Sequence, residues 1–249
     1  MRLILNQRRV MKMTKSKEPA KYRIIGIEPL THDTKAFKFE LDDDYALEFM
    51  PGDHVMIHAD IDGQLHKRPY TPSSTPDDAG FFEIIIKLYP NGLLSNYIHS
   101  QYVGDEIFIQ GPTPGGHFEN GMAKKIGMVA GGAGVTPYIS IIRTALRRAW
   151  KVDMTLLFAN KSIDDIILRD EIDGYAAKHS NFKVVYSLDE APEDWNGHVG
   201  HIDDNLLKQH LPEPADDTLI FLCGPPMMEF QLRKAILALG YEKKRLVIP

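Results

Sequence analysis

The chain has 249 residues, enough for one large domain or two small ones, and its 43% hydrophobic and 25% charged residues are typical of globular proteins. A net charge of -5 gives no indication of nucleic-acid binding, which usually requires a basic surface. The single cysteine excludes an intramolecular disulfide and a four-thiolate iron–sulfur site. The ten histidines show no metal-ligand spacing, so we expect no metal site and infer that any redox chemistry needs an organic cofactor.

The N-terminal residues carry no targeting signal. Their apolar run is only Leu3-Ile4-Leu5, whereas a signal peptide needs about 7–15 apolar residues and a membrane span about 20. Met11 and Met13 are alternative first residues, so we expect the first dozen residues to be disordered or not translated. We therefore expect a cytoplasmic protein without a membrane span.

The first half, from Tyr22 to about Phe118, consists of short β-like runs separated by Gly, Pro, Asn and Asp turns. These runs are 34–41, 54–58, 81–88 and 106–109. Many short strands at regular spacing predict an antiparallel barrel or sandwich. One helix is expected after Asn91-Gly92, because Leu94, Tyr97 and Ile98 follow at helical spacing.

The second half, from about Lys125, alternates apolar strands with helical segments. Strands are expected at 126–130, 152–158, 182–187 and 218–223, with a last short one at 245–248, and helices at 137–150, 163–179, 201–210 and 226–240. This alternation predicts a parallel sheet covered by helices on both faces. The sequence thus predicts a β-barrel domain at 20–119 followed by an α/β domain at 124–249.

Three segments are candidates for ligand binding. Gly131-Gly-Ala-Gly-Val-Thr-Pro137 joins a strand to a helix, where glycines and free N–H groups can accept a pyrophosphate, although a plain strand–helix turn is the alternative. Cys223-Gly-Pro-Pro-Met227 ends another strand and holds the thiol at the sheet edge, although a buried structural cysteine is equally compatible. Arg68-Pro-Tyr-Thr-Pro-Ser73 offers a guanidinium for a diphosphate, or is simply a surface loop.

In chain order, Arg68–Ser73, Gly92-Leu-Leu-Ser95, Gly131–Pro137 and Cys223–Met227 make the chain resemble the ferredoxin–NADP reductase superfamily, and within it the NADH–cytochrome b5 reductases. The likeness runs from about Tyr22 to Pro249 and includes His32-Asp33-Thr34, Pro51-Gly-Asp-His54 and Leu157-Phe-Ala-Asn160. It implies an FAD-binding barrel followed by an NAD-binding α/β domain. It also implies hydride transfer from NADH to FAD, and then electron transfer to a haem protein of the cytochrome b5 type.

The resemblance also implies roles for individual residues of the barrel. Arg68 and Pro69 would lie at the FAD diphosphate, Tyr70 would pack on the flavin, and Thr71 would lie near flavin N5. His54 would relay a proton there, unless it is only a structural histidine of its strand. Lys87 would help to bind NADH. The FAD phosphates would be capped by backbone N–H groups of Gly92, Leu93, Leu94 and Ser95.

In the second half, the resemblance implies a dinucleotide site and a nicotinamide site. The first would be lined by Gly132, Gly134, Thr136 and Pro137, and the second by Cys223, Gly224, Pro225 and Met227. Asp189 follows the third predicted strand, where the family places an acid beside the adenosine ribose. A carboxylate accepts a hydrogen bond from a 2′-hydroxyl and repels a 2′-phosphate, so we expect NADH rather than NADPH. A simple turn carboxylate is the alternative.

The chain departs from the family pattern at two positions. It ends in Pro249 where relatives commonly have an aromatic residue, and Met227 stands where the family has a third proline. Two other electron acceptors are compatible with the sequence: a ferredoxin or iron–sulfur oxygenase, and a free flavin or quinone. A non-catalytic flavin-binding module is a further alternative. The basic cluster Arg143, Arg147, Arg148 and Lys151 is expected to be a solvated helix face, or less readily a docking site for an acidic partner.

Overall fold

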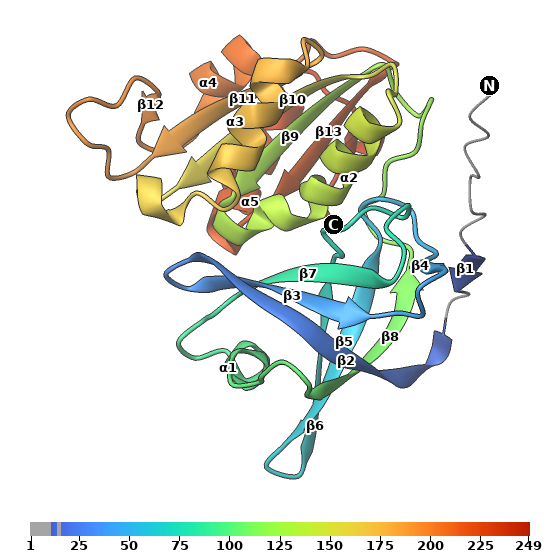
Figure 1. The fold of residues 1–249 in the computed structure, drawn as a ribbon. Helices are drawn as coiled ribbons and strands as arrows, with labels where there is room; N and C mark the ends of the chain where they lie inside the picture. The colour runs from blue at the N-terminus through green and yellow to red at the C-terminus, as the bar shows by residue number, and fades with distance from the viewer. Residues whose placement is uncertain (1–10, 14–15) are drawn as a thin grey trace, which may run out of the picture.

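The computed structural model describes residues 11–13 and 16–249. Two six-stranded sheets form its framework, an antiparallel one in the N-terminal half and a parallel one in the C-terminal half (Figure 1). The expected disorder of residues 1–10 lies outside the described residues. Residues Met11–Met13 form strand β1, which pairs in parallel with β4 (Tyr45–Leu47), so the expected lack of structure does not extend to them.

The antiparallel sheet has the strand order β6-β5-β8-β2-β3-β7. Its strands are β2 (Ser16–Thr31), β3 (Thr34–Glu40), β5 (His54–Ile61), β6 (Gln64–Tyr70), β7 (Phe81–Lys87) and β8 (Glu106–Thr113). A bridge between Pro72 and Ile84 joins the chain beyond β6 to β7, so the two edges of the sheet meet as in a barrel. Buried and more exposed residues alternate along β5, because one face of each strand packs into the barrel core. Helix α1 (Leu93–His99) follows β7, as predicted from the sequence.

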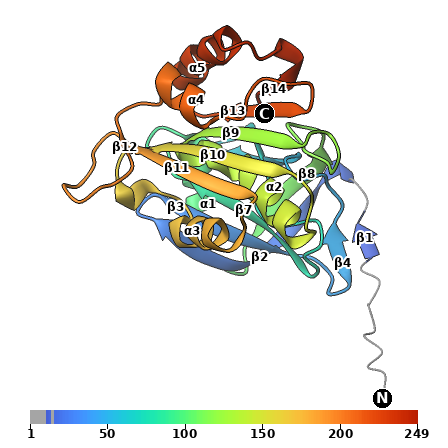
Figure 2. The same ribbon diagram turned by 90° about the horizontal axis from the view of Figure 1, so that it is seen from above.

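The parallel sheet has the order β12-β11-β10-β9-β13-β14, which is an α/β arrangement. Its strands are β9 (Lys125–Gly131), β10 (Asp153–Asn160), β11 (Phe182–Leu188), β12 (His198–Val199), β13 (Thr218–Cys223) and β14 (Leu246–Val247). Helices α2 (Thr136–Arg147) and α3 (Arg169–Lys178) lie on the face towards the barrel, and α4 (Asp204–His210) and α5 (Pro226–Ala238) on the other (Figures 1 and 2). The predicted fold class is confirmed: helices cover both faces, so the central strands are almost entirely buried.

Three local predictions were wrong. The segment 163–179 is not one helix: a short 3-10 turn at Ile163–Asp165 is capped by Ser162, and α3 begins only after Leu168, which has a φ of 57°. The helix expected from residue 201 begins at Asp204, because the Asp203 carboxylate caps it by accepting the Leu206 N–H at 2.8 Å. Arg68 to Tyr70 end the edge strand β6 rather than forming a loop, and an edge strand tolerates a proline.

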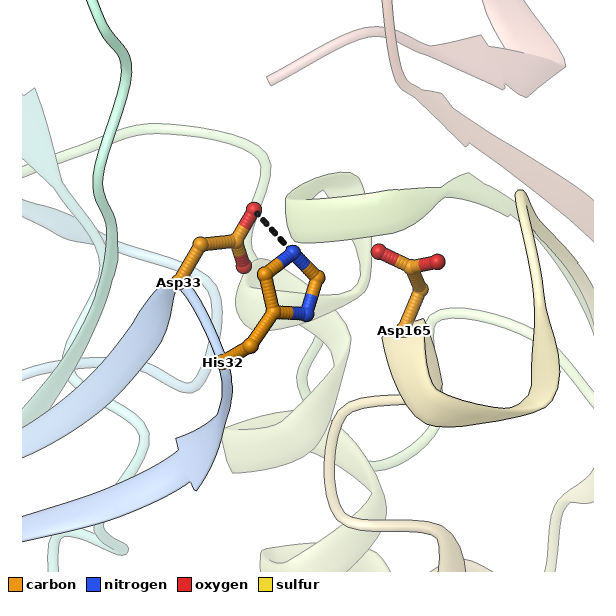
Figure 3. Close-up of side chains that lie close together, drawn as sticks. All are labelled: His32, Asp33 and Asp165. Carbon is orange, nitrogen blue, oxygen red and sulfur yellow. Dashed lines mark ion pairs between the residues drawn. The ribbon is translucent and has the colours of Figure 1, made fainter.

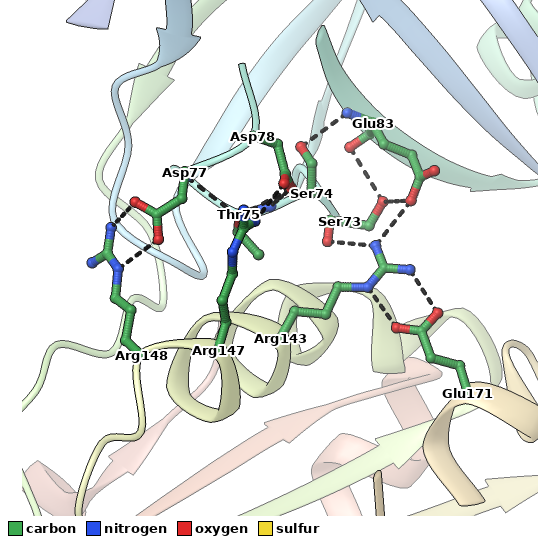
Figure 4. A network of polar contacts seen from close by, with 10 residues as sticks. All are labelled: Ser73, Ser74, Thr75, Asp77, Asp78, Glu83, Arg143, Arg147, Arg148 and Glu171. Atoms are coloured by element: carbon green, nitrogen blue, oxygen red, sulfur yellow. Dashed lines mark hydrogen bonds and ion pairs between the residues drawn. The ribbon is translucent and has the colours of Figure 1, made fainter. Parts of the chain in front are cut away.

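The basic cluster at α2 is not simply a solvated face, because three of its members bind the barrel (Figure 4). Arg143 donates to both carboxylate oxygens of Glu171 at 2.7 and 2.8 Å. It also donates to Glu83 of β7 at 3.0 Å and to the carbonyl oxygen of Ser73 at 2.8 Å. The guanidinium is therefore a buried link between the two halves.

The outer two arginines of this helix complete what we call the arginine clasp, formed by Arg143, Arg147 and Arg148. Arg147 donates to Asp78 at 2.6 Å and to the Thr75 hydroxyl at 3.0 Å, and Arg148 makes two hydrogen bonds to Asp77. All three acceptors lie in the loop that follows the Arg68–Thr71 segment. The clasp thus fixes α2 to the part of the barrel that carries one of the predicted sites.

Candidate functional site

The glycine loop after β9 and the Cys223 segment after β13 are in direct contact. A Cβ atom on Gly134 would lie 2.1 Å from the carbonyl oxygen of Cys223, so only glycine allows this approach. Gly132 has a φ of 51° and open space where a side chain would be. Pro137 lies in the first turn of α2, as predicted. The two segments therefore form one continuous surface at the carboxyl ends of neighbouring parallel strands, where α/β sheets bind ligands.

Cys223 lies at the end of β13 with its thiol mostly buried. Burial, and then the nearby negative charge of Glu229, raise the pKa of this thiol to about 12, so it is protonated at neutral pH. The Glu229 carboxylate also accepts the Gly224 N–H at 3.0 Å and fixes the turn before α5. Met227 is exposed beside it. Cys223 is therefore a packing surface with a neutral thiol, not an activated nucleophile.

On the barrel side, the segment from Arg68 to Thr71 presents different groups to solvent and to the core. Arg68 is exposed, and its guanidinium donates to the carbonyl oxygen of Lys67 at 2.8 Å. Tyr70 is half-buried against the barrel core, and burial raises its pKa to about 12. Thr71 is buried. The β5–β6 ladder pairs Val55 with Tyr70, so His54 and Thr71 each lie one residue beyond this pair, at the same end of the two strands.

Tyr89 connects the two sides, although the sequence analysis did not single it out. Burial raises the pKa of its hydroxyl, and the charges of Lys87, Asp33 and Cys223 also act on it. Tyr89 in turn acts on the hydroxyl of Tyr70. Asp33, which contacts Lys87, also lies close to Asp165 of the α/β half, so this part of the barrel faces the other half across one region. We call it the interdomain gap.

The Gly92–Ser95 segment forms the start of α1, with Gly92 as its N-cap. The Ser95 hydroxyl is engaged within this turn, because it donates to the Gly92 carbonyl at 2.9 Å and accepts the Tyr89 N–H at 3.2 Å. The backbone N–H groups of Leu93 and Leu94 have no acceptor within the helix, as in any first helical turn. Backbone donors, rather than the serine side chain, are thus what this segment offers to a ligand.

Asp189 follows β11 at the carboxyl edge of the parallel sheet. Its N–H donates to the carbonyl oxygen of Asn160 at 3.1 Å, and its carboxylate lies 3.5 Å from the exposed imidazole of His201. Asn160 ends the Leu157–Asn160 segment that carries part of the family resemblance, and the sequence predicted no role for it. Its side chain is only 6% exposed, and neither amide atom has a hydrogen-bond partner among the described residues. Unpartnered buried polar groups are rare and concentrate at binding sites.

The structure also brings together His32, Asp33 and Asp165, whose nearest ligand atoms lie within 4.8 Å of one another. Figure 3 shows the His32 ring between the two carboxylates, with Asp33 contributed by the barrel and Asp165 by the α/β half. The Asp33 carboxylate already contacts the Lys87 ammonium at 2.7 Å. A lysine thus balances this carboxylate, and we assign no cation to the cluster.

Comparison with known proteins agrees with this geometry. Residues 21–119 match the model of an oxidoreductase FAD-binding domain, and residues 128–234 that of an oxidoreductase NAD-binding domain. The chain is 39% identical over 229 residues to NADH-cytochrome b5 reductase 1 of Mycosarcoma maydis, covering 91% of this chain and 71% of that protein. It is 33% identical over 237 residues to the Dictyostelium discoideum protein of the same name, covering 93% and 83%.

The chain belongs to the NADH-cytochrome b5 reductase family.

A solved structure agrees with this family assignment. The cytochrome b5 reductase domain of Ulva prolifera nitrate reductase superimposes with a TM-score of 0.88 at 26% identity, over 96% of this chain and all of that domain. Within the described residues of this family member, no helix combines the length and apolar character needed to cross a bilayer.

The residues of this cytochrome b5 reductase family member fit the two nucleotides that its domain types bind. The open backbone at Gly132 and the first turn of α2 suit a pyrophosphate, and the Asn160 amide has donors and an acceptor that no group among the described residues uses. On the barrel side, the exposed Arg68 guanidinium suits a diphosphate, and the half-buried Tyr70 ring suits a flat flavin or its ribityl chain.

The last residue of this family member, Pro249, lies between the two halves (Figure 1). A Cβ atom on Gly116 of the barrel would lie 2.8 Å from Cγ of Pro249, and one on Gly115 would lie 2.8 Å from Nδ1 of His54. The proline ring is therefore close to the expected proton relay. It lies beside the interdomain gap, at the position where the family resemblance predicts an aromatic ring.

Proposed function

We propose that this protein is an FAD-dependent oxidoreductase that takes hydride from NADH and delivers electrons to a haem protein of the cytochrome b5 type. One observation carries the proposal: the Gly134 loop touches the Cys223 segment at the carboxyl edge of an NAD-binding domain, and this domain follows an FAD-binding domain in the same chain. When bound, FAD supplies the chemistry that links two-electron hydride transfer to one-electron acceptors. The boundaries inferred for the two domains are 20–119 for FAD and 124–249 for NAD.

The protein contributes position more than acid–base chemistry to this reaction. Hydride transfer requires two rings held at near-attack distance, and such positioning accounts for most of the rate in reactions of this kind. We assign Tyr70 and Arg68 to orienting the flavin, and Cys223 and Pro225 to the face that receives the nicotinamide. The neutral thiol of Cys223 suits this role, because a thiolate there would add an unpaired charge to a half-buried surface.

The proton that leaves flavin N5 when the reduced flavin is oxidised is assigned to the Thr71 hydroxyl and the His54 imidazole, which each lie one residue beyond the Val55–Tyr70 pair. His54→Ala should slow reoxidation of the reduced protein without changing the rate at which NADH reduces it. Stopped-flow measurements of the two half-reactions separate these effects. Equal reoxidation rates in the two proteins would remove His54 from the mechanism.

NADH is the proposed nucleotide because Asp189 places a carboxylate at the sheet edge beside Asn160. Asp189→Thr should raise kcat/KM for NADPH relative to NADH, since it removes the charge that repels a 2′-phosphate. Asp173→Thr, on the exposed side of α3, is a matched control for the loss of one carboxylate. If Asp189→Thr leaves the NADPH to NADH ratio unchanged, Asp189 is only a turn residue.

The acceptor is the finer part of the proposal. Rapid mixing of the NADH-reduced protein with cytochrome b5, a ferredoxin and a free quinone should give the highest second-order rate constant for cytochrome b5. A higher rate with the ferredoxin would favour the alternative of an iron–sulfur partner, which a separate chain must supply because this one has a single cysteine. If NADH does not bleach the bound flavin within seconds, the protein is a non-catalytic flavin-binding module. The cytoplasmic location expected from the sequence stays a prediction, which cell fractionation would test.

A further inference from the structure

The Lys87 ammonium is held by the carboxylate of Asp33. The Lys87 ammonium, at the end of β7, lies 2.7 Å from Oδ2 of Asp33, in the turn between β2 and β3. The β3–β7 ladder pairs Thr34 directly with Lys87, which brings the two side chains to the same edge of the barrel. Their exposed fractions are only 23% and 21%, so this ion pair is partly shielded from water.

The Asp33 carboxylate is itself fixed in place. Its second oxygen, Oδ1, accepts hydrogen bonds from the hydroxyls of Thr31 at 3.0 Å and Thr34 at 2.9 Å. Its backbone carbonyl oxygen accepts the Leu88 N–H at 2.7 Å. The carboxylate therefore cannot follow the lysine, and the flexible lysine must adopt the one position that the carboxylate allows. Burial tends to raise the pKa of Asp33, but bonds from Lys87 and the threonines lower it below 3.8, so the group is ionised at neutral pH.

The pair lies where the two halves meet. Asp165 of the α/β half is on the far side of His32 (Figure 3), and the Tyr89 hydroxyl feels the charges of Lys87, Asp33 and Cys223. An ammonium at this point lies on the barrel side of the boundary with the α/β half. It has three N–H donors, of which the Asp33 carboxylate occupies one.

We propose that Asp33 is a positioning residue for NADH binding, which holds the Lys87 ammonium in place so that its other donors meet oxygen atoms of the incoming dinucleotide. The inference rests on the proposed function. A lysine free in solvent loses much side-chain freedom when it binds a ligand, whereas Lys87 has lost it already through its contact with Asp33. Asp33 acts through Lys87 and touches no reacting atom.

Asp33 also has a second effect on the Kd for the dinucleotide, opposite in sign to its positioning effect, and the two must be measured separately. Its negative charge cancels that of Lys87, so removing it leaves a more positive site that attracts a dinucleotide. That attraction acts through solvent and is screened over about 4 Å at 0.5 M salt, whereas the loss of a fixed geometry is not screened. Measurements at high salt therefore isolate the positioning effect.

The test uses the FAD-loaded protein and equilibrium binding of NAD⁺ by calorimetry, together with NADH kinetics, all at 0.5 M salt. Asp33→Asn should raise the Kd for NAD⁺ by about 10- to 150-fold, the range expected for one charge-assisted hydrogen bond. The KM for NADH should rise in parallel, with flavin reduction at saturating NADH changed less than about twofold, because Asp33 does not approach the reacting atoms. Asp165→Asn removes a neighbouring carboxylate that does not contact Lys87 and should leave the Kd unchanged.

The decisive comparison is a double-mutant cycle. Lys87→Met should raise the Kd at least as much as Asp33→Asn, and the double variant should be no weaker than Lys87→Met alone, because Asp33 acts only through the lysine. Additive effects would overturn the inference, as would an unchanged Kd in Asp33→Asn. If Asp33→Asn does not fold, Thr34→Val removes one of the two hydroxyl contacts and must give a smaller increase of the same sign. Failure of the wild-type flavin to be reduced by NADH would instead refute the proposed function.

Discussion

Arg143 is the residue whose loss should most weaken the attachment of α2 to the barrel. Its side chain is 18% exposed, and its partners Glu83 and Glu171 are 10% and 28% exposed. Arg143→Met keeps most of the packing volume but leaves both carboxylates without their cation. Removing one partner of a buried pair typically costs 3–5 kcal/mol, and since Glu171 is partly accessible we expect about 3 kcal/mol. Glu83 also remains bonded to the Ser73 hydroxyl at 2.9 Å, which limits the loss.

Urea unfolding of the FAD-loaded protein measures this effect. With an m-value of about 3 kcal/mol/M, a loss of about 3 kcal/mol lowers the midpoint by about 1 M. Arg148→Met is the matched control, because its bidentate pair with Asp77 is 36% exposed on each side and should cost at most about 1 kcal/mol. The cost in Arg143→Met comes from stranded carboxylates, so adding Glu83→Gln and Glu171→Gln should recover most of it. Equal midpoints for the two single variants, or no recovery in the triple variant, would refute this reasoning.

Three further predictions concern the gap and the clasp. Gly134→Ala should destabilise the protein by about 1–3 kcal/mol in thermal melts and raise the KM for NADH, because its Cβ would overlap the Cys223 carbonyl. The control Gly174→Ala, in an open helical position of α3, should be neutral or stabilising in the same melts. Cys223 should react with iodoacetamide far more slowly than a free thiol at pH 8, since a pKa of about 12 leaves about one thiolate in ten thousand; a mass-spectrometric time course matching a free cysteine would contradict this. Burial raises the pKa of the Glu171 carboxyl, but Arg143 lowers it more, so that the folded pKa lies below 4.5. The ionised carboxylate therefore stabilises the fold above its unfolded pKa, and this contribution is lost as pH falls through the lower folded value. The urea midpoint of the wild type should therefore drop more between pH 5 and pH 3 than that of Arg143→Met.

Elements with a clear hydrophobic pattern could be predicted from the sequence, and those without one could not. Strand β13 has the same bounds in both, because a continuous apolar run between polar flanks has few alternatives. Strand β6 was missed because it is an edge strand, exposed along most of its length, and shows no alternation. Strand β2 was missed because its two prolines resemble turn residues in the sequence, and two register shifts against β3 interrupt its alternation. The break before α3 depends on the left-handed backbone of Leu168, whose φ of 57° no hydrophobic pattern indicates.

The residues of the candidate site were likewise predictable from the sequence only in part. Segments such as the Gly134 loop were found because they follow strands, and a parallel sheet brings strand ends to one edge. That β9 and β13 are neighbours, so that Gly134 touches Cys223, depends on the strand order and could not be read from spacing. The Asp33–Lys87 pair and the links from Arg143 to the barrel join residues far apart in the chain. Single residue types carry no signal for such pairings, so a basic helix face was interpreted as solvated.

The clasp has a consequence for how members of this family can diverge. Helix α2 carries the arginines near its C-terminal end and the Gly131–Pro137 loop at its N-terminal end, and its 12 residues span about 18 Å. A tilt of about 5° at the clasp would move the opposite end by about 1.6 Å over such a length. Displacements of about 1 Å already change the rate of reactions that depend on alignment. Substitutions on a remote helix face can therefore retune electron flow, while every residue that touches a cofactor stays the same.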